Sequence, residues 1–349
     1  MSPRNQSGRF RIFAALCALI VGFGAYTLWH QFVAFTNGPM EGIEAGETVV
    51  VEQGDSFAAV LGKLRAAGID DGHDLEWQLL ARQLKAAGRI QVGEYALEPG
   101  QSPRELLVAM RDGDVLNYRF TIIEGWNIRQ LRAALARAKP LVQETVDMDS
   151  DALMEALGHA GQHPEGRFLP ETYVYTRGDS DLDVLRRAHG AMARALDAAW
   201  ESRAADLPFD SKDEALVLAS IVEKETGTAE ERARIAGVFV RRLEKGMRLQ
   251  TDPTVIYGIG DAYDGNITRA HLEQDTPYNT YVRGGLPPTP IAMPGADALR
   301  AATRPADGDA LYFVAVGDGS GRHVFSDSLA EHQVAVRAYL KRYRERHGR

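Results

Sequence analysis

The sequence predicts an α+β protein that one N-terminal helix attaches to a membrane. Three observations support this fold class. An uncharged apolar segment lies near the N-terminus, short strand-forming runs lead through glycine turns into helices, and a strongly apolar helix in the second half ends in two carboxylates. The chain has 349 residues, of which 45% are apolar and 25% charged, as expected of a globular body with a sizeable core.

Charge and cysteine content exclude several classes of protein. The net charge of −8 argues against a broad nucleic-acid surface, because phosphate binding requires an excess of Lys and Arg. The one cysteine, Cys17, lies in the N-terminal apolar segment, which excludes an intrachain disulfide and a cysteine-based metal site. The sequence has no glycine-rich phosphate loop. We therefore expect no metal, no cofactor and no nucleic-acid partner.

The N-terminal segment has the length and the flanks of a membrane anchor. Residues 1–11 carry three arginines and no acid, residues 12–34 are mostly apolar, and an acidic linker follows at 35–46. Roughly 20 helical residues span a bilayer. Basic residues before the span place the N-terminus in the cytoplasm and the body on the other side. A cleaved signal peptide is the alternative, but the apolar run is long for one and no convincing small-residue cleavage site follows it.

Strand–turn–helix units follow the linker. They begin near Val49, Tyr95 and Phe120, and each has a strand-forming run, a glycine turn, a Ser or Asn cap and an apolar-periodic helix. A further helix is expected over 75–87. Residues 47–115 are therefore predicted to form a small αβ module, in which the spacing of the units is too uneven for a solenoid.

The helix predicted over 211–226 is the most informative element. Ser211 and Glu214 have the spacing of a capping box, and apolar residues cover most of the helix circumference. The helix ends with Glu223 and Glu225 on opposite flanks of its apolar face. Lost hydration there raises a carboxyl pKa toward the range of a general acid. The alternative is a helix end whose glutamates pair with nearby cations, and the pattern alone does not choose between the two residues.

The remainder is predicted to be mainly helical with one hairpin. Helices are expected over 185–200, 230–243, 296–303 and 329–343, and a buried strand at 311–316 is expected to pair with 323–325. Pro253 is expected to bar a helix at its position.

Polar segments around this helix are candidate sugar sites. An amide, a hydroxyl and a carboxylate side by side suit the hydroxyl and N-acetyl groups of amino sugars, and aromatic rings pack on pyranose faces. An ordinary polar turn or a helix cap is the alternative for each segment. The candidate substrate-binding residues are Glu171, Ser220, Gln250, Thr251, Asp252, Tyr278, Asn279, Thr280 and Tyr281.

Five motifs follow one another in the second half: A-S-I-V-E-K-E-T at 219–226, R-L-Q-T-D-P-T-V-I-Y-G at 248–258, Y-N-T-Y at 278–281, G-L-P-P at 285–288 and L-Y-F-V at 311–314. This set resembles the MltG (YceG-like) family of membrane-bound endolytic murein transglycosylases. The similarity runs from about residue 45 to about residue 342. It implies that Glu223 is the catalytic glutamate, that residues 47–115 are a LysM-like module, and that residues 116–349 are the catalytic domain. The module either holds glycan or only positions the catalytic part.

The resemblance also implies the reaction and the location. Such an enzyme is a lyase that cuts MurNAc–GlcNAc bonds inside nascent peptidoglycan strands, leaves 1,6-anhydro-MurNAc ends and so terminates strand elongation. It needs no metal or cofactor, because one glutamate serves as acid and then as base. The expected place is the cell inner membrane, single-pass and with the catalytic part periplasmic, next to peptidoglycan synthases.

Two other functions stay open at this point. A hydrolytic muramidase needs a second carboxylate, for which Glu171 and Asp252 are the candidates. A non-catalytic, membrane-tethered glycan-binding scaffold needs none.

Overall fold

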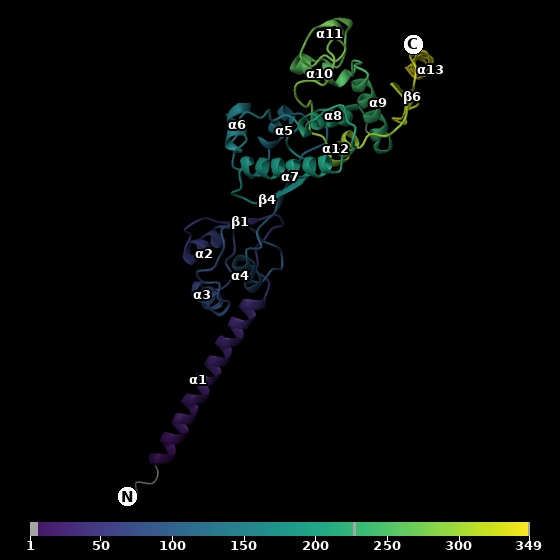
Figure 1. The fold of residues 1–349 in the computed structure, drawn as a ribbon. Coiled ribbons are helices and arrows are strands. Elements are labelled where there is room, and N and C mark those ends of the chain that lie inside the picture. Colours follow the sequence, from purple (N-terminus) through teal and green to yellow (C-terminus); the bar gives the residue numbers. More distant parts are fainter. Residues whose placement is uncertain (1–5, 226–227, 348–349) are drawn as a thin grey trace. The chain divides into compact units, whose positions relative to one another are not determined.

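The computed structural model describes residues 6–225 and 228–347, and it divides into two compact units. Unit 1 comprises Met1–Tyr118 and Thr176–Gly178, and unit 2 comprises Arg119–Tyr175 and Asp179–Arg349. Helices predominate, and the described strands pair into small two-stranded sheets (Figure 1). The predicted mixed α+β class is therefore confirmed.

Unit 1 begins with the long helix α1 (Gln6–Asn37). An 18-residue window of its segment Phe10–Asn37 has a mean hydropathy of 2.0 and is not buried by other parts of the described chain. The end of the helix packs against the rest of unit 1, where Thr36 is buried and Phe35 contacts Trp77. At a rise of 1.5 Å per residue, this segment is long enough to cross a bilayer. A membrane-spanning N-terminal helix is thus compatible with the structure, and the direction in which it crosses stays a prediction.

The globular part of unit 1 has the predicted strand–helix–helix–strand order. Strand β1 (Thr48–Val51) pairs antiparallel with β2 (Gly93–Ala96), and α2 (Phe57–Ala66) and α3 (Asp74–Gln83) lie between them in the chain. Helix α4 (Pro103–Asp112) follows. As predicted, serine side chains cap α2 and α4: Ser56 accepts from Ala59 N–H, and Ser102 forms a capping box with Glu105.

Unit 2 is mainly helical. Strands β3 (Tyr118–Thr121) and β4 (Thr172–Tyr175) form one small sheet, and β5 (Tyr312–Ala315) and β6 (His323–Ser326) form the predicted antiparallel hairpin. The helices are α5 (Ile128–Leu135), α6 (Ser150–Ala156), α7 (Asp181–Glu201), α8 (Lys212–Glu225), η2 (Ala229–Glu231), α9 (Arg232–Glu244), α10 (Asp252–Ile259), η3 (Gly260–Ala262), α11 (Arg269–Glu273), α12 (Ala296–Thr303) and α13 (Leu329–His347).

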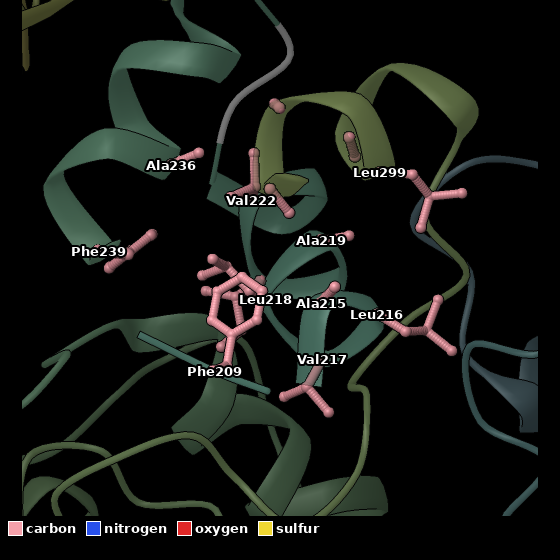
Figure 2. Close-up of a cluster of buried hydrophobic side chains, with 14 of the residues drawn as sticks. Phe209, Ala215, Leu216, Val217, Leu218, Ala219, Val222, Ala236, Phe239 and Leu299 are labelled. Atoms are coloured by element: carbon pink, nitrogen blue, oxygen red, sulfur yellow. The ribbon is translucent and has the colours of Figure 1, made fainter. Parts of the chain in front are cut away.

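Helix α8 is the centre of unit 2. Its predicted capping box is present, because Ser211 and Glu214 each receive the other's backbone N–H. Every residue from Ala215 to Val222 is buried, including the polar Ser220. Helices α7, α9 and α12 pack around it, with Phe209, Phe239 and Leu299 among the contacting side chains (Figure 2). A helix that is apolar on all sides is expected in the interior.

Two local expectations were wrong. Pro253 lies in the first turn of α10 and does not bar a helix there. First-turn N–H groups have no acceptor within the helix, and the fixed φ of proline suits this position. Strand β5 is half-buried rather than buried, because β6 is its one partner strand among the described residues.

The burial of α8 predicts a large effect of truncating its side chains. Leu218→Ala removes a fully buried side chain, so we expect a loss of about 3 kcal/mol in unfolding free energy and a lower Tm. Thermal unfolding of the detergent-solubilised chain measures it. Leu340→Ala, at a position 42% exposed on α13, is the matched control and should cost much less. Equal losses in the two variants would contradict the packing described above.

Candidate active site

The two glutamates at the end of α8 lie in different surroundings. The Glu223 side chain is only 6% exposed. Its Oε2 accepts a hydrogen bond of 3.0 Å from the backbone N–H of Gly295, and its Oε1 lies 3.6 Å from the Arg232 guanidinium. Glu223 does not line the cavities described below.

Arg232 binds three carboxylates at the start of α9. Besides Glu223, its guanidinium lies 3.7 Å from Glu124 and 3.5 Å from Asp297. Burial raises the pKa of Glu223, Gly295 and Arg232 oppose that rise, and the charge of Glu124 adds to it. A Cβ at Gly295 would lie 2.0 Å from Glu124 Oε1, so a larger residue here would displace the Glu124 side chain. We call Glu124, Glu223, Arg232 and Asp297 the Arg232 cluster.

Glu225 lines a cavity of about 450 Å³, which we call the Glu225 cavity. This volume is within the usual range for ligand sites. One wall comes from the end of α8 and the start of α10, and the other comes from β5 and α13. The polar side chains that line it are Glu225, Arg242, Gln250, Asp252, Tyr281, Tyr312 and His332.

The carboxyl group of Glu225 has one hydrogen-bond donor among the described residues, the hydroxyl of Thr251, which contacts Oε1. Burial raises the pKa of Glu225, the Thr251 hydrogen bond opposes this, and the nearby Asp252 charge adds to it. Asp252 Oδ1 in turn accepts a hydrogen bond of 2.6 Å from Tyr281. Glu225 therefore keeps its proton to a higher pH than a free glutamate, as a general acid requires.

Arg242 supplies a fixed cation to the same cavity. It donates to the carbonyls of Leu311, Leu249 and Arg248 at 2.7, 2.8 and 3.2 Å, and its guanidinium lies 5.1 Å from the Tyr312 ring centre. These contacts immobilise the positive charge, and no carboxylate among the described residues forms an ion pair with it. A bound group with partial or full negative charge is the natural complement.

His332 lies on the opposite wall, on α13. Its ring stacks on Tyr312 with centres 5.1 Å apart, and its buried Nδ1 has no hydrogen-bond partner in the described part of the chain. Burial and the nearby Arg242 charge lower the pKa of His332, so the ring is neutral near pH 7.

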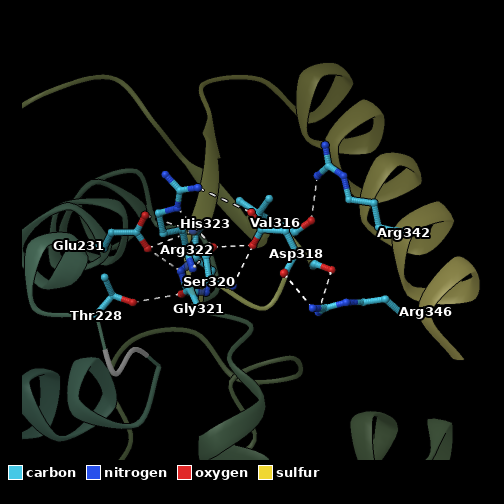
Figure 3. A network of polar contacts seen from close by, with 11 residues as sticks. Thr228, Glu231, Val316, Asp318, Ser320, Gly321, Arg322, His323, Arg342 and Arg346 are labelled. Atoms are coloured by element: carbon cyan, nitrogen blue, oxygen red, sulfur yellow. Dashed lines mark hydrogen bonds and ion pairs between the residues drawn. The ribbon is translucent and has the colours of Figure 1, made fainter.

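A polar network holds the β5–β6 wall in place (Figure 3). Glu231 accepts from the backbone N–H of His323 at 3.0 Å and contacts its ring Nδ1 at 2.8 Å. Thr228 donates to the Gly321 carbonyl. On the other side, Arg342 and Arg346 of α13 donate to the carbonyls of the hairpin turn. The hairpin is thus attached both to the segment after α8 and to α13.

Of the predicted site residues, the structure brings four together with Glu225: Gln250, Thr251, Asp252 and Tyr281. Ser220 does not reach the cavity, because its hydroxyl donates to Val217 O and accepts from Ile291 N–H inside the core. Glu171 is exposed next to β4, away from the cavity lining. Tyr278 packs edge-on against Tyr257, with ring centres 4.8 Å apart.

Asn279 and Thr280 shape the loop rather than line the cavity. Asn279 is fully buried and donates to the carbonyls of His271, Leu272 and Gln274. The Thr280 hydroxyl accepts from Thr251 N–H at 3.1 Å. Their polar groups are satisfied inside the protein, which orients Thr251 and Tyr281 toward Glu225.

Three polar or aromatic residues that line the cavity were not predicted from the sequence as site residues: Arg242, Tyr312 and His332. Arg242 belongs to a predicted amphipathic helix on which a buried arginine has no distinguishing pattern. Tyr312 lies within the L-Y-F-V motif, which predicted a strand and contributed to the family resemblance but indicated no binding role for the tyrosine. His332 is a single histidine without ligand spacing, so no pattern in the sequence signals it.

Comparisons with known proteins agree on one family. The model of the YceG-like family matches residues 49–338. A protein of Bacillus subtilis named endolytic murein transglycosylase is 31% identical over 281 residues, which are 75% of this chain and 76% of that protein. A Streptococcus pneumoniae protein of the same name is 26% identical over 302 residues, 77% of this chain and 54% of that protein. The crystal structure of a YceG-like protein from Listeria monocytogenes is 26% identical with a TM-score of 0.50, and it covers 82% of this chain and 98% of that one.

The Thr251 hydrogen bond predicts a shift in the titration of Glu225. Thr251→Val removes the donor that stabilises the ionised carboxylate, so the pKa of Glu225 should rise further. ¹³C NMR of side-chain carboxyls measures it, with Glu225→Gln to assign the signal. Thr251→Ser keeps the hydroxyl and should leave the pKa near that of the unmodified protein. A rise of the same size in both variants would refute the role given to this bond.

The Arg232 cluster predicts a pH-dependent loss of stability. Arg232→Met leaves Glu223 buried without its cation, so we expect a loss of about 3 kcal/mol near neutral pH. The pKa of Glu223 is already raised in the folded protein and rises further in the variant. The loss of unfolding free energy should therefore be smallest below pH 4.5, the ordinary pKa of a glutamate, where the Glu223 carboxyl is protonated in the folded and the unfolded state. It should grow as the pH rises.

Urea denaturation at a series of pH values tests this expectation. Arg300→Met is the control, because Arg300 is 67% exposed and pairs with Asp297 at the surface. It should cost less than about 1 kcal/mol. A loss in Arg232→Met that does not change with pH would count against the ion pair with Glu223.

Proposed function

This chain belongs to the YceG-like family, and from that premise we propose that it is an endolytic peptidoglycan lytic transglycosylase. Such an enzyme is a lyase that cuts the glycan strand internally between MurNAc and GlcNAc and leaves 1,6-anhydro-MurNAc ends. The relatives from Bacillus subtilis and Streptococcus pneumoniae bear the name of this activity, and they match three quarters of the chain.

The single observation that carries the assignment of the acid is the position of Glu225 in its cavity. Glu225 faces a space large enough for a sugar, together with Gln250, Asp252 and Tyr281. Glu223, to which the family resemblance assigned the role, faces Gly295 and Arg232 instead. The geometry thus favours Glu225 as the general acid over Glu223.

In the proposed reaction Glu225 acts twice. Its carboxyl proton goes to the oxygen that links MurNAc to the leaving GlcNAc, and the glycosidic bond breaks. The 6-hydroxyl of the same muramic acid then forms the new bond to the anomeric carbon, and Glu225 accepts its proton. Atoms balance without water, and Glu225 ends as it began. The raised pKa of Glu225 suits the first step, because the protonated form is the reactive one.

Fixed charges in the Glu225 cavity support this reaction. Asp252 lies at the first turn of α10 and accepts a hydrogen bond from Tyr281. Its carboxylate stabilises positive charge that develops at the anomeric carbon. The immobilised Arg242 complements a carbonyl or carboxylate oxygen of the substrate.

One observation favours a hydrolytic muramidase as the second candidate. Glu225 and Asp252 line the same cavity, and ordinary glycosidases use two carboxylates that flank the bond. In that reaction water replaces the 6-hydroxyl, and the product carries a reducing end. Glu171 is not a suitable second carboxylate, since it lies outside the cavity lining.

Helix α1 and unit 1 support a proposal for the setting of the reaction. We place the protein at the cell inner membrane as a single-pass protein, with the N-terminus cytoplasmic and the catalytic unit periplasmic. Nascent glycan strands are then within reach, and peptidoglycan synthases are the expected neighbours. The strand–helix–helix–strand part of unit 1 is proposed to be a LysM-like module that holds or orients glycan.

A digest of peptidoglycan tests both the reaction and the acid. The full chain in detergent should release fragments with anhydro-muramic ends, identified by mass spectrometry. Glu225→Gln removes the acid and should lower the rate about 10²- to 10⁴-fold. Glu223→Gln keeps the acceptor for Gly295 N–H and should lose less cleavage activity than Glu225→Gln. Glu244→Gln, at an exposed site on α9, is the matched control and should cleave normally.

The other outcomes identify the alternatives. Reducing ends would establish the muramidase, and Asp252→Asn should then be as inactive as Glu225→Gln. If Glu223→Gln were the inactive variant and Glu225→Gln cleaved faster, Glu223 would be assigned as the general acid. Glycan binding without cleavage by any of these proteins would indicate a scaffold.

A further inference from the structure

A second cavity lies on the other side of the α8 end, and the proposed reaction does not use it. We call it the Tyr257 cavity. Its volume is about 430 Å³, close to that of the Glu225 cavity and within the range of ligand sites. The last turn of α8, the first turn of α5 and the helix α10 form its walls. Its polar lining includes Asn127, Arg129, Lys224, Tyr257, Asp261 and Tyr263.

The Tyr257 side chain is held in one position. Its hydroxyl donates a hydrogen bond of 3.0 Å to Glu165 Oε2, and its ring packs against Tyr278. Glu165 is fully buried and receives the Ile128 N–H at the start of α5 with both oxygens, at 3.1 and 3.2 Å. A rigid aromatic ring beside amide groups is a suitable surface for the apolar face of a sugar.

The charges that line the Tyr257 cavity leave an excess of one cation. Arg129 pairs with Asp261 at 3.3 Å. Lys224 donates to the Gly125 carbonyl at 3.2 Å and forms no ion pair with the described residues. Its charge is therefore available to an anion at the cavity wall.

The two cavities are adjacent along the chain. Lys224 and Pro253 line the Tyr257 cavity, and their neighbours in the sequence, Glu225 and Asp252, line the Glu225 cavity. The Cα atoms of consecutive residues lie about 3.8 Å apart, so the walls of the two cavities meet at the α8 end and at the start of α10. A strand cut internally extends on both sides of the broken bond. In murein, the muramic acid units carry short peptides with free carboxylates.

We propose that the Tyr257 cavity binds a peptide-bearing N-acetylmuramic acid unit of the strand, with the sugar on Tyr257 and a peptide carboxylate on Lys224. This inference rests on the proposed function, because it takes peptidoglycan as the substrate. It assigns to the protein a preference for strands that still carry their peptides.

Binding of a monomer tests the proposal separately from catalysis. The probe is an N-acetylmuramyl tetrapeptide, which has no internal glycosidic bond to cut, and calorimetry with the full chain in detergent measures its affinity. We expect saturable binding that weakens as salt is raised. Lys224→Met should weaken it about tenfold or more and remove most of the salt dependence. Lys224→Arg keeps the charge and should retain binding.

Matched variants separate this site from others. Lys212→Met removes an exposed lysine from the same helix and should bind as the unmodified protein does. Tyr257→Ala should weaken binding of the monomer and of its peptide-free sugar alike. Absence of binding to the unmodified protein, or normal binding by Lys224→Met, would overturn the proposal. If the unmodified protein binds the monomer but its digest of peptidoglycan yields no anhydro ends, the reaction assignment fails while this site stands.

Discussion

The geometry of the candidate active site depends on the burial of α8. The residues from Ala215 to Val222 are enclosed by α7, α9 and α12, so the helix has no freedom to rotate or shift. Its last turn therefore emerges at one place and in one orientation. Three consecutive side chains leave it in three directions: Glu223 to the Arg232 cluster, Lys224 to the Tyr257 cavity, and Glu225 to the Glu225 cavity. A change in packing far below the surface is transmitted to all three.

The acidic residues of the site have separate tasks. The Arg232 cluster joins the end of α8 to the start of α9, to the Glu124 loop and to the first turn of α12. Glu223 thereby stabilises the position of the helix end through charge and through the Gly295 hydrogen bond. Glu225, on the opposite flank of the helix, has a neutral hydroxyl partner and an acidic neighbour, and both its burial and the charge of Asp252 raise its pKa. The two glutamates belong to one short motif, and they differ in the surroundings of their side chains.

Local features of the fold were predictable, because a few neighbouring residues determine them. The capping boxes at Ser102 and Ser211 and the bounds of α12 are of this kind. The β5–β6 hairpin followed from its turn. The choice between Glu223 and Glu225 was not predictable from periodicity, since it depends on Gly295, far along the chain. For the same reason Asn279 and Thr280 were expected to bind sugar: a polar side chain has the same pattern whether its partner is a ligand or a buried carbonyl.

The Glu225 cavity joins segments that are synthesised far apart in time. Its inner wall ends with Asp252 and Tyr281, and its outer wall begins with Tyr312 and reaches Val336 on α13, near the C-terminus. The hairpin turn of the outer wall is held by Arg342 and Arg346, which come later still. A growing or truncated chain therefore has α8 and its glutamates but no closed pocket. The complete cavity forms only when the last helix has folded, so a truncated copy of this protein lacks the pocket in which the proposed acid lies.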